Sequence, residues 1–81
     1  MMILKDFIEQ EIELGHIGCF EDFRSSLQNL TIGEDEKELD LDEYEDYLDY
    51  PVEWAEIKQN FNRYDGVVWY EIELAVVENE E

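Results

Sequence analysis

The chain has 81 residues and a formal net charge of −19, from 24 acidic residues against 5 Lys and Arg. Phosphates would repel such a surface, so the charge argues against direct binding to nucleic acid or to anionic lipid. Acidity alone is typical of disorder, but hydrophobic residues at 44% and aromatic residues at 14% predict one small folded domain over residues 1–81.

The first part of the chain contains two segments with helical spacing of apolar residues. A first helix is predicted over residues 3–14, where Gly15 ends an apolar face made by Leu4, Phe7, Ile8 and Ile12. A second helix is predicted over residues 20–30, from the heptad-like spacing of Phe20, Phe23, Leu27 and Leu30.

The middle segment, residues 34–49, is compatible with a strand, a helix or a loop. Acidic residues alternate with other residues from Glu36 to Asp42, which favours a strand. Asp and Glu are poor strand formers, so an extended edge strand or a loop fits almost as well. We expect Asp42 to cap a helical turn that carries Tyr44 and Tyr47.

The last part of the chain predicts a helix followed by a strand. Pro51 suits the first turn of a helix, whose apolar stripe would be Trp54, Ile57, Phe61 and Tyr64. Asp65-Gly66 is a turn signal, and residues 67–77 alternate as a strand does. The predicted fold is therefore a small, mainly helical α+β domain with about three helices and one or two antiparallel strands.

Acidic side chains concentrate between Glu34 and Glu56, where twelve of twenty-three residues are Asp or Glu and only Lys37 opposes them. Alternate residues of a strand lie about 6.6 Å apart, and helical neighbours about 6 Å apart. Phosphates along a DNA strand are separated by about 7 Å through space. The predicted partner-binding residues are Glu34, Asp35, Glu36, Glu38, Asp40, Asp42, Glu43, Tyr44, Glu45, Asp46, Tyr47, Asp49, Tyr50, Glu53 and Glu56.

With this acidic segment and its interleaved tyrosines, the chain resembles the small DNA-mimic inhibitors of phages and mobile elements. That class includes anti-restriction proteins, anti-CRISPR proteins and uracil-glycosylase inhibitors, and it has many unrelated folds. The resemblance implies a stoichiometric and often dimeric blocker in the cytoplasm of a bacterial host. Its implied partner is a basic nucleic-acid-binding protein, such as a CRISPR effector complex or a restriction enzyme.

Two other functions fit the same composition. The chain could be an immunity or antitoxin protein for a cationic nuclease, or a solvated acidic adaptor domain. We expect no catalytic residues, no metal and no cofactor, because a glycine-rich phosphate loop and a serine nucleophile motif are missing, and His16 and Cys19 alone cannot complete a zinc site. Short apolar runs, a single cysteine and no visible signal peptide predict a cytoplasmic protein without a membrane span.

Overall fold

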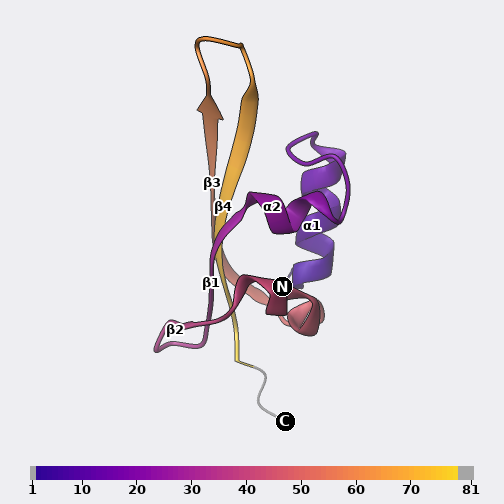
Figure 1. Ribbon diagram of the computed structural model, residues 1–81. Coiled ribbons are helices and arrows are strands. Elements are labelled where there is room, and N and C mark those ends of the chain that lie inside the picture. Colours follow the sequence, from indigo (N-terminus) through magenta and orange to yellow (C-terminus); the bar gives the residue numbers. More distant parts are fainter. Residues whose placement is uncertain (1, 79–81) are drawn as a thin grey trace.

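A four-stranded mixed sheet organises the fold, and the helices lie together on one of its faces (Figure 1). The structure is a computed structural model that describes residues 2–78. The elements in chain order are α1 (Leu4–Glu13), α2 (Asp22–Ser26), β1 (Leu27–Ile32), β2 (Lys37–Glu38), the 3₁₀-helix η1 (Leu41–Tyr47), β3 (Val52–Phe61) and β4 (Val68–Val76).

The strands lie in the order β2-β1-β4-β3, so the last strand in the chain is central. β4 runs parallel to β1, with Leu30 opposite Leu74, and antiparallel to β3, with Ile57 opposite Ile72. The parallel pair is possible because β2, η1 and β3 occupy the long connection between β1 and β4.

The core lies between this sheet and the helices. Strand β4 contributes Ile72, Leu74 and Val76, all fully buried, as the alternation within residues 67–77 predicts. The predicted apolar face of α1 is also confirmed, since Leu4 and Ile8 are fully buried. Complete burial of such side chains contributes about 1.5–3 kcal/mol each.

The β3–β4 hairpin extends well beyond the helices, and the molecule is 49 Å long but only 24 and 19 Å in its other dimensions (Figure 1). The N–H of Asn62 donates to the carbonyl of Val67 at 2.9 Å and closes the hairpin turn. The carboxylate of Asp65 accepts from the N–H of Val67, also at 2.9 Å, and so stabilises the turn predicted at Asp65-Gly66.

The domain contains more sheet than the sequence predicted, and the expectation of a mainly helical fold is wrong. Residues 20–30 form the short helix α2 and then strand β1, and the helix predicted after Pro51 is strand β3. The alternating acidic segment supplies only the two-residue strand β2. The helical turn that follows is capped by Asp40, whose Oδ1 accepts from the N–H of Asp42 at 3.1 Å, and not by Asp42.

A candidate acidic interaction site

In the 3₁₀-helix η1, a repeat of three residues places carboxylates on one side and aromatic rings on another. A 3₁₀-helix has three residues per turn and rises about 2.0 Å per residue, so side chains three apart stack in rows with a spacing of about 6 Å. The row that faces the core is Leu41, Tyr44 and Tyr47, and the exposed row is Asp40, Glu43, Asp46 and Asp49. The same i to i+3 pattern continues past η1, where the N–H of Tyr50 donates to the carbonyl of Tyr47 at 3.0 Å.

The tyrosines of this segment hold η1 against the core. Tyr44 is buried, and its ring meets that of Phe23 edge-on with centroids 5.3 Å apart. Burial, followed by the negative charge of Glu45, raises the pKa of Tyr44 above its usual value. Tyr44 is predicted to contact a partner, and the structure shows that its side chain packs inside the protein and presents little surface.

Tyr47 and Tyr50 are half-buried and remain partly available at the edge of η1. Their rings meet edge-on, with centroids 4.8 Å apart. Burial raises the pKa of Tyr47, and the charge of Glu43 adds to that effect. Each of the two tyrosines directly follows a member of the exposed row in the chain, Asp46 or Asp49.

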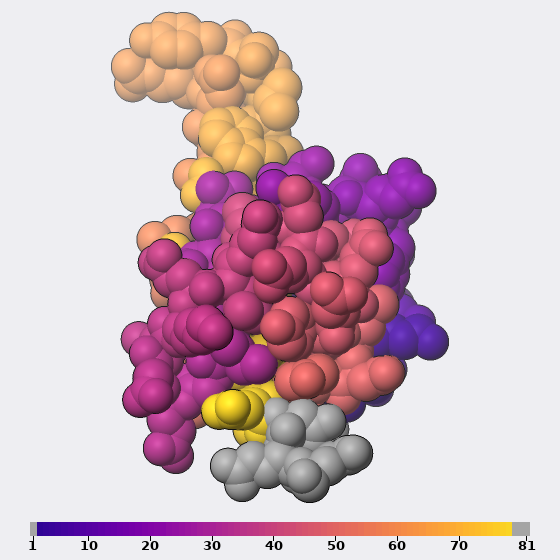
Figure 2. All heavy atoms as spheres, turned by 60° about the horizontal axis from the view of Figure 1, so that its bottom comes forward, coloured from indigo at the N-terminus to yellow at the C-terminus, as the bar shows by residue number. Residues whose placement is uncertain are grey.

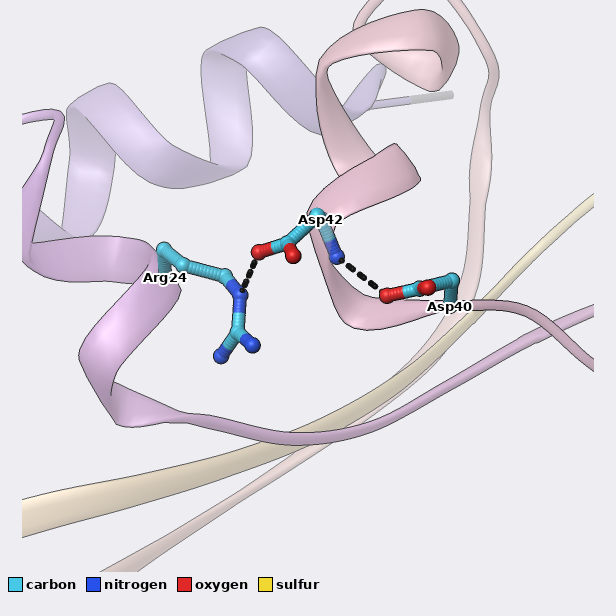
Figure 3. Close-up of polar contacts among 3 residues, drawn as sticks. All are labelled: Arg24, Asp40 and Asp42. Atoms are coloured by element: carbon cyan, nitrogen blue, oxygen red, sulfur yellow. Dashed lines mark hydrogen bonds and ion pairs between the residues drawn. The ribbon is translucent and has the colours of Figure 1, made fainter.

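Arg24 fixes the start of η1 from the neighbouring helix (Figure 3). Its Nε donates to Oδ1 of Asp42 at 2.5 Å, and it links α2 to a segment 18 residues further along the chain. Asp40 and Asp42 thus have structural partners, whereas Glu43 and Asp46 are exposed carboxylates of the same segment.

A second group of carboxylates surrounds a hollow beside the turn between β1 and β2. Glu34 and Asp35 lie in this turn, and Glu53 at the start of β3 and Glu78 after β4 complete the acidic lining. The hollow has a volume of about 570 Å³. Its size and charge suit the end of a Lys or Arg side chain.

The structure gathers most of the predicted carboxylates on one end of the body. Figure 2 shows the segment from residue 34 to residue 50 spread over the surface nearest the viewer, with the hairpin tip behind it. We call this surface the acidic face, and its exposed members are Glu34, Asp35, Glu36, Glu38, Asp40, Asp42, Glu43, Glu45, Asp46 and Asp49. Glu53 adjoins it through the hollow, but Glu56 lies apart, opposite Glu73 in the hairpin.

The sequence reasoning missed the hairpin tip, which is the most exposed aromatic surface of the described residues. Tyr64 is 86% exposed and Phe61 is 62% exposed. Residues 57–70 contain Lys58 and Arg63 but only one acidic residue, Asp65, so this segment has a net charge of +1 in a chain of −19. That local break in acidity was the available signal.

Other kinds of site find little support in residues 2–78. The carboxylate of Glu11 is buried against the imidazole of His16, whose ring lies 4.7 Å from that of Tyr70, and this group connects α1 to β4. Over the described residues, no three His, Cys, Asp or Glu side chains come together as metal ligands. Within that same range, no helix is long and apolar enough to cross a membrane. Comparison of the chain with protein-family models, with curated proteins and with solved structures finds no match.

Proposed function

We propose that the protein is a DNA-mimic inhibitor whose acidic face occupies the nucleic-acid-binding surface of a basic protein. The observation that carries the proposal is the exposed row of η1, in which Glu43, Asp46 and Asp49 repeat about every 6 Å. This spacing is close to the separation of neighbouring phosphates, so the row could meet Lys and Arg side chains that normally contact a nucleic-acid backbone.

Electrostatic attraction favours such a complex chiefly by speeding up encounter. The field of the acidic face extends over a Debye length of about 8 Å at physiological salt, and steering of this kind raises association rates by about 10- to 1000-fold. Each exposed ion pair adds only about 0–1 kcal/mol, so several pairs must act together. Tyr47 and Tyr50, half-buried beside the row, would add the aromatic contacts that interfaces favour.

The partner would be a defence protein of a bacterial host, with a CRISPR effector complex or a restriction enzyme as the first candidates. The inhibitor would act in the cytoplasm by occupancy, without catalysis, cofactor or membrane contact. An immunity protein for one cationic nuclease would use the same surface, and the experiment below separates the two functions by the identity of the partner.

The test is capture of partners from a host lysate by the tagged protein at about 0.1 M salt, with elution by salt or by competing DNA. The test variant combines Glu43→Lys with Asp46→Lys on the acidic face. The control combines Glu9→Lys with Glu13→Lys on the exposed side of α1. Each double substitution changes the net charge by +4, from −19 to −15, so only the position of the charges differs.

We expect one nucleic-acid-binding protein, released by salt and by DNA, that the control captures and the η1 variant does not. Equal loss in both variants would mean that net charge alone drives capture, which contradicts mimicry by the acidic face. Capture of a single nuclease toxin would favour an immunity protein, and failure to capture any basic protein would favour an acidic adaptor domain.

A further inference from the structure

Strand β3 forms an edge of the sheet, and most of its outer side is unpaired. The N–H of Val52 donates to the carbonyl of Met2 at 2.8 Å, so the N-terminal segment covers the first residue of the strand. Among the described residues, no other backbone hydrogen bond reaches the outer side of β3. In an antiparallel ladder, the backbone N–H and C=O groups of successive residues point alternately toward the paired strand and away from it. Asn62 bonds to Val67 across the turn, so the backbone groups of Ala55, Ile57 and Gln59 point away from β4.

The free edge lacks most of the features that keep edge strands from pairing. β3 has 10 residues, and proline is found only before it, at Pro51. Its single irregularity of register lies at the start, between Val52 and Trp54. Natural edges are usually short, bulged, proline-containing or strongly charged, so a long regular edge on an acidic protein suggests a strand partner.

We propose that the partner is a second copy of this chain, whose β3 pairs antiparallel with β3 about a two-fold axis at Ile57. The two sheets would then join into one eight-stranded sheet, with the same surface used by both copies. The axis position follows from charge, because it sets Glu56 opposite Lys58 of the second copy, and Lys58 opposite Glu56. An axis at residue 56 would instead oppose two glutamates, and an axis at residue 58 would oppose two lysines.

The same register relieves two unfavourable features of the isolated hairpin. Glu56 lies directly opposite Glu73 within the hairpin, a like-charge pair that Lys58 of the second copy would flank. Trp54 is 38% exposed in the single chain, and in the dimer it would lie opposite Asn60 of the second copy.

Global charge also selects the hairpin as the place where two copies can meet. Two chains of net charge −19 repel each other, but residues 57–70 have a net charge of +1. With β3 antiparallel to β3 about Ile57, Phe61 of each copy lies opposite Glu53 of the other, so the hairpin tip of one copy lies beside the acidic start of β3 in the second copy. The inference does not depend on the proposed function, because its test measures the mass of the protein and not the capture of a partner.

The test begins with the mass of the wild-type protein in solution, measured by sedimentation over micromolar to sub-millimolar concentrations. Gln59→Pro removes an outward N–H and should block pairing while the ladder to β4 stays intact. Glu56→Lys places a lysine opposite Lys58 of the other copy and should weaken the dimer by about tenfold or more. Within one chain, the same substitution places a positive charge opposite Glu73. Adding Lys58→Glu to Glu56→Lys restores opposite charges across the axis and should restore the dimer.

Cross-linking tests the register. In a Cys19→Ser background, Ile57→Cys should form a disulfide between copies, because residue 57 faces itself across the axis. Ala55→Cys is the control, because it faces Gln59 of the second copy and should remain reduced. A wild-type protein that stays monomeric, a dimer unaffected by Gln59→Pro, or a disulfide at residue 55 and not at 57 would each overturn the proposal.

Discussion

Arg24 on α2 and Asp42 on η1 are joined by a hydrogen bond of 2.5 Å between Nε and Oδ1. The link fastens the start of η1 to the helix that precedes β1, and it neutralises one carboxylate at the border of the acidic face. Asp42 is therefore a structural carboxylate, although its sequence neighbours are free to meet a partner. This distinction underlies the choice of Glu43 and Asp46 as the positions that test the function.

Loss of the Arg24 side chain should destabilise the fold slightly. Both partners are substantially exposed, so Arg24→Ala should lower the free energy of unfolding by at most about 1 kcal/mol. The measurement is urea unfolding followed by tryptophan fluorescence. Arg63→Ala is the matched control, because it removes the same charge from the hairpin tip, where the guanidinium contacts the neighbouring Tyr64. Equal effects of the two substitutions would contradict a structural role for Arg24.

Removal of the His16 imidazole should have a larger effect. His16→Ala leaves the carboxylate of Glu11, only 3% of which is exposed, without its hydrogen-bond partner and also removes the ring contact with Tyr70. We expect a loss of about 1–3 kcal/mol of unfolding free energy. The double variant with Glu11→Gln should lose less than the sum of the two single changes, because the pair is coupled. Additive losses would show that the two groups act independently.

Tyr44 should make the fold sensitive to alkali. Its pKa is raised by burial and by Glu45, so the folded state holds the phenol proton more tightly than the unfolded chain does. The resulting stability is fully present below the ordinary pKa of 10.0 and is lost as the pH rises through the raised value. Unfolding by urea at increasing alkaline pH should show a steeper fall for the wild type than for Tyr44→Phe. Tyr64→Phe, at an exposed position, should behave as the wild type does.

Glu36 has a backbone conformation that disfavours its side chain. Its φ is +51°, in the left-handed region that Asn tolerates better than Glu. Glu36→Asn should therefore raise the free energy of unfolding by about 0.5–1 kcal/mol. Glu34→Asn, which removes the same charge from the same turn, should change stability less. If both variants gain equally, relief of charge repulsion explains the gain and backbone strain does not.

The regular alternation of residues 67–77 and the amphipathic pattern of residues 3–14 predicted β4 and α1 correctly. Both elements bury most of one face against a common core, so the periodicity of the buried face appears directly in the sequence. The exposure of the carboxylates in the acidic segment also followed from its composition, since charged side chains seldom enter a core.

The error at residues 20–30 has a structural cause. A bulge in β1 between Leu27 and Asn29 shifts the register, so the buried Leu27 and Leu30 are three residues apart. A three-residue interval in a strand resembles helical spacing, and the preceding Phe23 belongs to a real helix. The apolar spacing of residues 20–30 therefore continues from α2 into β1 and predicts one helix where there are two elements.

The error at residues 51–64 arose because β3 is exposed on both sides for most of its length. Ile57 faces the same side of the hairpin as the core residue Ile72, whereas Trp54 lies opposite Ala75 on the other side. The apolar residues of such a strand need not alternate, and their intervals of three and four matched a helix. The turn at Asp65-Gly66 followed by a good strand was the stronger signal, because a hairpin requires a strand before its turn.

The central position of β4 has a consequence for the order in which the protein can fold. β1 and β3 both pair with β4, which follows them in the chain, so neither gains its main neighbour until residues 68–76 have been synthesised. During translation β1 and β3 therefore stay unpaired with β4 until that last strand emerges. Parallel pairing of β1 with β4 over such a long interval is slow. Mutual repulsion between nascent chains would then limit aggregation before the sheet closes.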